Sequence, residues 1–167
     1  GLDQSTSGGS FLWLQKAIAR CLDVELSGAK QLFSGEHDGY RRLSDPAVHR
    51  RSIEFDSARN EFIVEDVIDC AGAHVAEVSW HFSEECEVRA AGTVVCARAG
   101  GVTVTVSPER SESPPQLLRG QCDPPAGWVS RSYDAKVPTT TAVWSFSVRG
   151  TTRFVTLLKV EFQQRAE

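Results

Sequence analysis

Alternating apolar and polar residues recur along most of this chain. Residues 48–55 and 61–68 form two such runs, separated by the turn-forming sequence DSARN. Residues 142–148 and 154–162 alternate in the same way on either side of Gly150. Because successive side chains of a strand point to opposite faces, this alternation predicts strands with one buried and one exposed face. The short connections predict hairpins, and therefore antiparallel pairing.

The predicted fold class is all-β. Strand-like runs return about every ten residues, as in sandwiches, and no helical patterns alternate with them as they would in a parallel sheet. We therefore expect a single domain over residues 1–167, built as an antiparallel two-sheet β-sandwich of the jelly-roll or supersandwich type. A closed antiparallel barrel is the geometric alternative.

Two segments are less regular. Within residues 11–26, apolar residues recur at helical spacing and favour a short N-terminal helix, whereas residues 18–26 nearly alternate and favour a strand. The strand is the preferred prediction. Residues 107–125 hold five of the seven prolines and predict a long loop around the sheet edge, followed by a further loop that ends at Pro138.

Composition limits the possible partners. The chain has 18 Lys and Arg against 22 Asp and Glu, a formal net charge of -4 and a pI near 5.6, so nucleic acid is not an expected partner. No apolar run is long enough to span a membrane, and the first residues lack the pattern of a signal peptide. The absence of methionine indicates a fragment of a longer protein.

The cysteines do not predict a metal or redox site. There are five of them, without C-x-x-C spacing, and reduced, half-buried thiols are the expected state. One disulfide is the alternative if the parent protein is exported. The histidines are dispersed and the acidic residues scattered, so we expect neither a metal nor another cofactor. The cellular compartment is left open.

Residues 35–51, GEHDGYRRLSDPAVHRR, concentrate chemistry that the rest of this acidic chain lacks. His37, Asp38 and Tyr40 supply an imidazole, a carboxylate and a phenol beside a glycine. The four fixed positive charges of this segment are those of Arg41, Arg42, Arg50 and Arg51. Arginine binds carboxylate or sulfate in two-point fashion, and histidine or tyrosine transfers protons, so the segment suits an anionic ligand. A surface turn followed by an amphipathic strand with solvated arginines is the alternative.

Few other residues are candidates for function. His74 and His81 are seven positions apart in one predicted strand, so they point to opposite sides and cannot share a metal. His74 is expected at a strand end, and His81 on an outer face. Trp128 and Tyr133 are candidates for stacking against a sugar, although Trp128 is equally suited to a core. The common signatures of phosphate-binding loops, dinucleotide-binding sites, zinc proteases and serine hydrolases are absent from the sequence.

Several motifs together resemble one known family. HDGYRRL is followed by HRR about ten residues later, then by EDVIDCAGAHVAEVSWHF and GWVSRSYDAKVP. In this order they resemble the C-terminal part of the heparinase II/III-like family of bacterial polysaccharide lyases, over nearly the whole chain. The resemblance implies an N-terminal α/α-toroid domain that is absent here, a β-sandwich, and β-elimination on acidic polysaccharides such as glycosaminoglycans or alginate-like chains.

The resemblance also limits what this chain does. It implies that the main catalytic residues lie in the toroid, so the chain is expected to be inactive alone and to form one wall of a cleft for a uronate-containing polysaccharide. The positions that match the family are His37, Asp38, Tyr40, Arg41, His49, Arg50, His81, Trp128 and Tyr133, and none has an assigned catalytic role. We expect the substrate-binding residues to be His37, Asp38, Tyr40, Arg41, Trp128 and Tyr133. A non-catalytic carbohydrate-binding module and a purely structural interdomain role are the alternatives.

Overall fold

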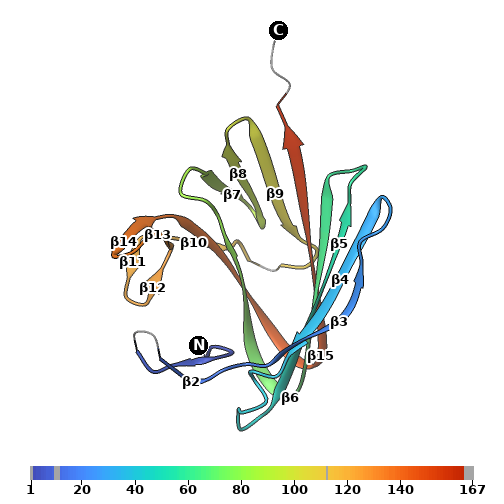
Figure 1. The fold of residues 1–167 in the computed structure, drawn as a ribbon, viewed down its shortest axis with the longest axis vertical. Helices are drawn as coiled ribbons and strands as arrows, with labels where there is room; N and C mark the ends of the chain where they lie inside the picture. The colour runs from blue at the N-terminus through green and yellow to red at the C-terminus, as the bar shows by residue number, and fades with distance from the viewer. Residues whose placement is uncertain (1, 10–11, 112, 164–167) are drawn as a thin grey trace. The chain divides into compact units, whose positions relative to one another are not determined.

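The computed structural model describes residues 2–9, 12–111 and 113–163, which form strands and no helix (Figure 1). None of these residues belongs to a helix that is long and apolar enough to cross a membrane. The strands are β1 (Thr6–Ser7), β2 (Trp13–Gln15), β3 (Ala19–Glu25), β4 (Lys30–His37), β5 (Ala47–Asp56), β6 (Glu61–His81), β7 (Glu87–Ala91), β8 (Val94–Ala99), β9 (Val102–Pro108), β10 (Gln116–Arg119), β11 (Gln121–Cys122), β12 (Pro125–Ala126), β13 (Trp128–Ser132), β14 (Ala135–Pro138) and β15 (Thr140–Phe162).

The predicted all-β, antiparallel class is confirmed, because every strand pair with a recorded register is antiparallel. The preferred strand at residues 18–26 is found as β3, which pairs with β4. The alternative helix does not form over residues 12–26, and residue 11 lies outside the described part of the chain. Pairing with β4 satisfies the backbone groups along one edge of β3. This long-range pairing, which helical spacing does not take into account, explains why that spacing did not decide the structure.

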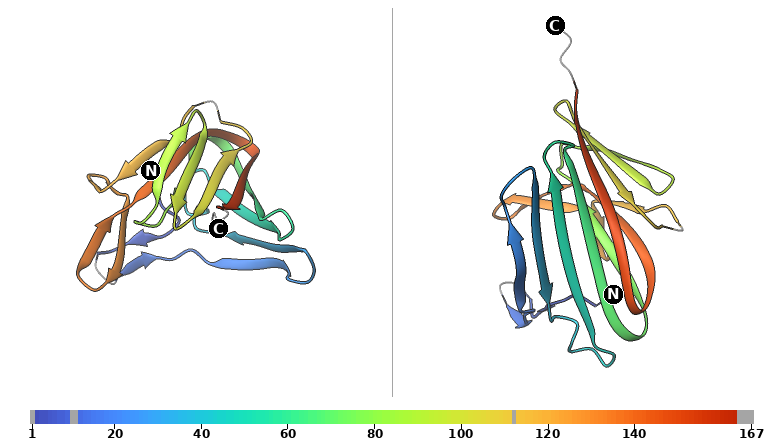
Figure 2. Two further views of the ribbon diagram at one scale, coloured as in Figure 1. Left: turned by 90° about the horizontal axis from the view of Figure 1, so that it is seen from above. Right: turned by 90° about the vertical axis from the view of Figure 1, so that its right-hand side faces the viewer.

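The chain divides into two compact units, each containing part of β6 and part of β15. Unit 1 comprises residues 1–75 and 147–155, and unit 2 comprises residues 76–146 and 156–167. In unit 1, β3, β4, β5 and β6 lie side by side in chain order (Figure 2). β5 and β6 meet at a hairpin in which Asn60 has a φ of 53°, a left-handed conformation that asparagine tolerates better than most residues.

Unit 2 contains the main apolar core. β7, β8 and β9 form successive hairpins, and β9 pairs with the last part of β15. Gly92 and Gly100 adopt positive φ in the turns that join these three strands, where glycine carries no steric penalty. The core cluster consists of Val95, Val106, Ala142 and Trp144, with Trp80, Phe82, Val88, Val104, Phe146 and Leu158 packed against it.

The two predicted loops are wrong in part, because both contain strands. Within residues 107–125, β10 pairs with the start of β15, and β11 pairs with β12. The loop expected before Pro138 is the hairpin of β13 and β14. Prolines stand at the ends of β12 and β14, so they leave the pairing of their neighbours intact. Proline content therefore predicted where strands stop but overstated the length of the irregular chain.

Candidate functional site

Strand register in unit 1 brings four polar side chains together. His37 on β4 lies opposite His49 on β5. Two residues further along β5, Arg51 lies opposite Asp66 on β6. Side chains directly opposite in an antiparallel pair share a face of the sheet. These four residues, called here the polar row, come from three strands. They are spread over residues 37–66 of the sequence, yet they form one continuous hydrogen-bonded network.

Hydrogen bonds join the polar row from end to end. His37 Nε2 and His49 Nδ1 are 3.0 Å apart, and His49 Nε2 lies 2.6 Å from Asp66 Oδ1. Arg51 donates from Nε to Asp66 Oδ1 at 2.7 Å and from a terminal nitrogen to Asp66 Oδ2 at 2.9 Å. Both carboxylate oxygens of Asp66 are thus engaged, and the guanidinium pair is bidentate.

Asp66 is ionised at the buried end of the row. Its exposure is only 2%, and burial by itself raises the pKa of a carboxyl group. The hydrogen bonds from His49 and Arg51, together with their charges, outweigh that effect and lower the pKa of Asp66. At neutral pH the carboxylate therefore accepts hydrogen bonds from both neighbours.

His37 has the opposite character. Burial, the neighbouring His49 and the charge of Arg51 lower the pKa of His37, although Asp38 acts in the other direction. The backbone N–H of Gly39 donates to His37 Nδ1 at 3.3 Å. Since Nε2 contacts His49, both ring nitrogens of His37 are engaged within the protein, and neither is available as a general base in this structure.

The turn formed by residues 38–43 follows β4 and is anchored to the N-terminal segment. Asp38 Oδ1 accepts a hydrogen bond of 2.7 Å from the backbone N–H of Ile18. Arg42 donates to the backbone carbonyls of Asp3 and Gly39, and to that of Gln4 at 3.3 Å. Gly39 is buried, and a Cβ at this position would lie 2.3 Å from the Gln4 carbonyl oxygen. Glycine is therefore required here by close approach of two backbones.

Tyr40 and Arg41 occupy different environments in this turn. The Tyr40 ring lies 5.4 Å from the His37 ring, centroid to centroid, and burial raises the pKa of Tyr40, with Asp3 adding to the effect and Arg42 opposing it. Arg41 is exposed, and its side chain has no hydrogen-bond or ion-pair partner among the described residues. Tyr40 is therefore a neutral phenol at physiological pH, and Arg41 an available cation.

A hollow of about 340 Å³ opens beside the polar row. Gly35 is the residue of β4 opposite Arg51, and the Phe33 ring lies close to it, since a Cβ on Gly35 would be 3.2 Å from Phe33 Cζ. The hollow is lined by Gln4, Ala19, Arg20, Cys21, Phe33, Gly35, Glu36, His37, His49 and Arg51. Arg20 is exposed and lies opposite Glu36, so its side chain is on the other face of the sheet from those of His37 and Arg51, and Arg51 supplies the positive charge in the hollow. The hollow therefore combines hydrogen-bonding rings, an aromatic side chain and positive charge.

Trp128 and Tyr133 belong to the hairpin of β13 and β14 in unit 2. Trp128 is half-buried, donates from Nε1 to the Gln121 carbonyl at 2.8 Å, and has the Lys136 ammonium 4.2 Å from its ring centroid. Tyr133 is 92% exposed. Arg131, on the same hairpin, pairs with Glu84 and lowers the pKa of that carboxyl to about 2. Of the two predicted stacking residues, only Tyr133 presents an uncovered side chain.

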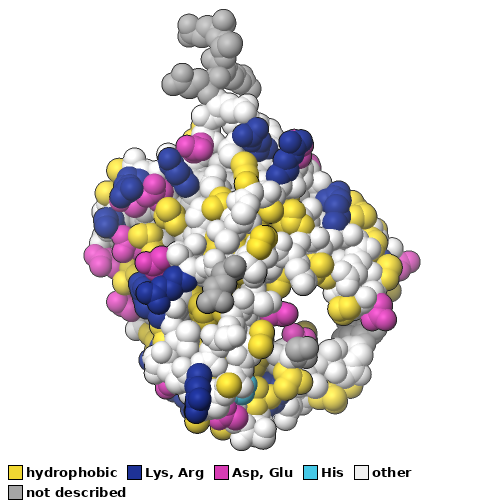
Figure 3. All heavy atoms as spheres, turned by 180° about the vertical axis from the view of Figure 1, so that it is seen from behind, with side chains coloured by type: hydrophobic (Ala, Val, Ile, Leu, Met, Phe, Trp, Pro, Cys, Tyr) yellow, Lys and Arg dark blue, Asp and Glu magenta, His cyan; other side chains and the backbone are white. Residues whose placement is uncertain are grey.

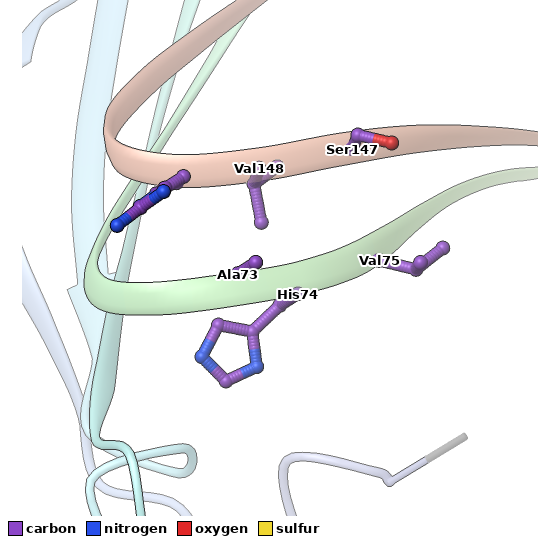
Figure 4. A pocket seen from close by; sticks show the side chains of 6 residues that line it. Ala73, His74, Val75, Ser147 and Val148 are labelled. Carbon is purple, nitrogen blue, oxygen red and sulfur yellow. The ribbon is translucent and has the colours of Figure 1, made fainter.

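The remaining histidines lie apart from the polar row. His74 was expected at a strand end but lies inside β6, with Nε2 2.5 Å from Asp45 Oδ2. The Gly72 N–H also donates to this oxygen, and these bonds lower the pKa of Asp45. His74 borders a hollow of about 380 Å³ with Ala73, Val75, Ser147, Val148 and Arg149 (Figure 4). His81 is exposed, as expected, with Nδ1 2.9 Å from Thr141 Oγ1 in unit 2.

Sequence reasoning found most of the polar row but missed Asp66. Asp66 lies in an alternating run, where a single carboxylate at an inward position looks like any other charged strand residue. Its role depends on the pairing of β5 with β6, which places it opposite Arg51. One signal could have identified it: Asp66 stands two positions after buried Val64, so both side chains point to the same face of β6. Among the described residues, no group of three or more histidine, cysteine or acidic side chains is arranged to hold a metal ion.

Comparison with known proteins identifies the family of this chain. Residues 1–157 match the family model described as Heparinase II/III-like, C-terminal. The chain belongs to this family. No curated protein matches it.

Solved structures share the fold. A heparan sulfate lyase, HepC from Pedobacter heparinus, matches with a TM-score of 0.71 and 17% identity, over 91% of this chain and 23% of that chain. A crystal structure of heparinase III matches with a TM-score of 0.69 and 16% identity, over 90% of this chain and 22% of that one. This chain thus spans less than a quarter of the length of either protein. The likeness shows a common fold and agrees with the predicted resemblance.

Proposed function

We propose that this chain forms one wall of the cleft in which a longer heparinase II/III-like lyase cleaves an acidic, uronate-containing polysaccharide by β-elimination. The observation that carries this proposal is the hollow beside the polar row, with Arg51 in its lining and exposed Arg41 on the neighbouring turn. Elimination requires the uronate carboxylate to be neutralised so that the adjacent proton becomes acidic. Available guanidinium groups supply such a partner in two-point geometry.

The same geometry supports binding rather than proton transfer as the role of this wall. Both nitrogens of His37 are engaged, and the pKa of Tyr40 is raised, so neither side chain is poised as a base near neutral pH. The base and acid of the reaction then come from the rest of the longer protein. We therefore propose that the chain is inactive alone.

Exposed apolar side chains support a partner domain in the same longer chain. Figure 3 shows hydrophobic side chains reaching the surface between charged ones on one face. The first part of unit 1 exposes Leu2, Leu12, Trp13, Leu14, Ile18, Leu22, Val24, Leu26 and Phe33. Surface of this kind is typical of contact between domains. We propose that an N-terminal domain, of toroid type by family resemblance, packs against it.

Lyase activity tests this proposal directly. β-Elimination leaves an unsaturated uronate, whose ultraviolet absorbance is followed with a panel of uronate polysaccharides. We expect the longer parent protein to release this product and the 167-residue chain to release none. Product formation by this chain alone would place the catalytic residues within it and contradict the proposal.

Replacing Arg41 with alanine in the longer parent protein should lower kcat/KM for its polysaccharide about tenfold. The reason is the loss of one charge-assisted hydrogen bond to the substrate, which contributes about 1.5 kcal/mol. Steady-state kinetics measures the effect. Arg59→Ala is the matched control, because Arg59 is also exposed but lies at the hairpin between β5 and β6, at the other end of β5 from the turn. Equal values of kcat/KM for the two variants would show that Arg41 is not part of the binding surface.

A carbohydrate-binding module is the second candidate, favoured by the exposure of Tyr133. On that reading the 167-residue chain binds acidic oligosaccharides alone, and Tyr133→Ala weakens this binding about tenfold because a sugar-stacking ring is lost. Tyr133→Phe is the control, since it keeps the ring and should retain affinity. Isothermal titration calorimetry measures both variants. The absence of saturable binding by the unmodified chain would exclude this candidate.

A further inference from the structure

The His37–His49 pair accommodates two protons in its present geometry. The ionised Asp66 carboxylate only accepts hydrogen bonds, so His49 Nε2 carries a proton toward it. The Gly39 N–H points at His37 Nδ1, so this nitrogen carries none. The contact between His37 Nε2 and His49 Nδ1 holds the second proton, which His37 donates. Every position in the row then has a donor facing an acceptor.

A third proton breaks this pattern wherever it enters. If His37 takes the charge, both its nitrogens carry protons, and Nδ1–H faces the Gly39 N–H. If His49 takes the charge, its Nδ1 donates to His37 Nε2, and the proton of His37 moves to Nδ1. Both routes place two donors face to face at the same point, and the bond that closes the turn at Gly39 is lost.

The surroundings of His37 add to this effect. From its own turn, Asp38 favours a charged His37, but the Asp38 carboxylate is already bonded to the Ile18 N–H. From β5, Arg51 and His49 oppose that charge, and Asp66 on β6 acts on His49 rather than on His37 directly. From β3, the residue opposite is Ala19, which has no charge. The other charged or titratable groups around the hollow and the turn are Asp3, Arg20, Cys21, Glu36, Tyr40, Arg41 and Arg42.

We propose that the polar row is an acid-sensitive latch on residues 38–43, which holds the turn closed at neutral pH and releases it when a third proton enters the histidine pair. Release frees the turn that carries Tyr40 and Arg41. If the proposed function holds, acid therefore weakens binding of a polyanion. A histidine that simply gained charge beside an anion would have the opposite effect, so the sign of the pH dependence separates the two.

Nuclear magnetic resonance tests the latch without any ligand. In the 15N-labelled chain at about pH 8, above the ordinary histidine pKa, His37 should be protonated at Nε2 and bare at Nδ1. As the pH falls to about 4.5, the hydrogen-exchange protection of the Gly39 amide, corrected for intrinsic exchange, should decrease. The opening constant should rise by up to about tenfold per pH unit, the slope for uptake of one proton.

Two variants isolate His37 as the cause. In His37→Asn the side-chain oxygen replaces Nδ1 as the acceptor for the Gly39 N–H, as in an Asx turn, but does not titrate in this range. Protection of Gly39 should then stay constant from about pH 8 to about pH 4.5. His81→Gln, a histidine change in unit 2, should keep the acid sensitivity of the unmodified chain.

Several results would overturn the latch. Protonation of His37 at Nδ1 at neutral pH would remove its basis. Titration of His37 with undiminished Gly39 protection would show that the turn does not respond, and an unchanged pH dependence in His37→Asn would assign it to another group. The unmodified chain gives the first two results even if the variant does not fold. Because no polysaccharide is used, failure of the latch and failure of the proposed lyase role are distinguishable.

Discussion

Asp66→Ala is expected to destabilise unit 1 by about 3 kcal/mol, at the lower end of the range for breaking a buried ion pair. The change leaves Arg51 and His49 without the carboxylate that accepts from both. The cost is not larger because the Arg51 side chain is partly exposed and regains water. Amide hydrogen exchange measures the effect, since protection should fall in β4, β5 and β6 but not in β8 and β9.

Asp69→Ala is the matched control for this change. Asp69 is an exposed aspartate on the same strand, and its recorded bond is to the Thr151 hydroxyl. We expect the control to cost less than about 0.5 kcal/mol, as is usual for surface substitutions. Similar losses for the two variants would mean that the polar row does not stabilise the sheet.

The contribution of Asp66 also depends on pH. Its pKa is lowered in the folded state, so the unfolded chain binds more protons when the pH falls below the ordinary aspartate range. The stabilisation is therefore fully present at neutral pH and is lost as the pH falls through the folded pKa. His37 contributes earlier, because its lowered pKa makes the folded state less stable once the pH drops below the ordinary histidine value.

Trp144→Ala should destabilise unit 2 by about 4 kcal/mol, as large-to-small changes of a core aromatic do. Trp144 is 2% exposed in the cluster with Val95, Val106 and Ala142, and its Nε1 donates to the Thr93 carbonyl at 3.0 Å. Removal leaves a cavity and deprives the partly buried Thr93 carbonyl of its donor. Denaturation by urea, followed through amide exchange in β8 and β9, measures the loss.

Trp13→Ala provides the comparison for this second change. Trp13 is 55% exposed, so its removal from the isolated chain should cost less than about 1 kcal/mol. Trp144→Phe keeps most of the volume but loses the hydrogen bond, and should fall between the two. A small effect of Trp144→Ala would show that the cluster is not the main support of unit 2.

The sequence predicted strands well where one face of the strand is buried and the other is exposed to solvent. β5 and the first part of β6 follow from the alternation of residues 48–55 and 61–68 and from the turn residues between them. A turn at Gly150 was also expected, but residues 140–162 form the single strand β15, within which Gly150 has a φ of 65°. At β3 the near alternation of residues 18–26 predicted the strand correctly, although helical spacing competed and every residue of β3 is exposed.

The candidate site was predictable as a cluster but not as a network. His37, Asp38, Tyr40 and Arg41 are neighbours in sequence, so composition was enough to find them. Asp66 joins them only through strand register, a property of long-range pairing that no local pattern contains. The engagement of both His37 nitrogens depends on the Gly39 amide and His49, and it changes the expected role of His37 from proton transfer to support of the turn.

The division of β6 and β15 between the units has a consequence for how this domain is inherited. The chain passes from one unit to the other after residues 75, 146 and 155. No single break in the gene separates them, because a cut after residue 75 removes residues 147–155 from unit 1. Recombination that exchanges one unit for a foreign equivalent would need several simultaneous joints inside hydrogen-bonded strands. The polar site of unit 1 and the apolar core of unit 2 should therefore be inherited together.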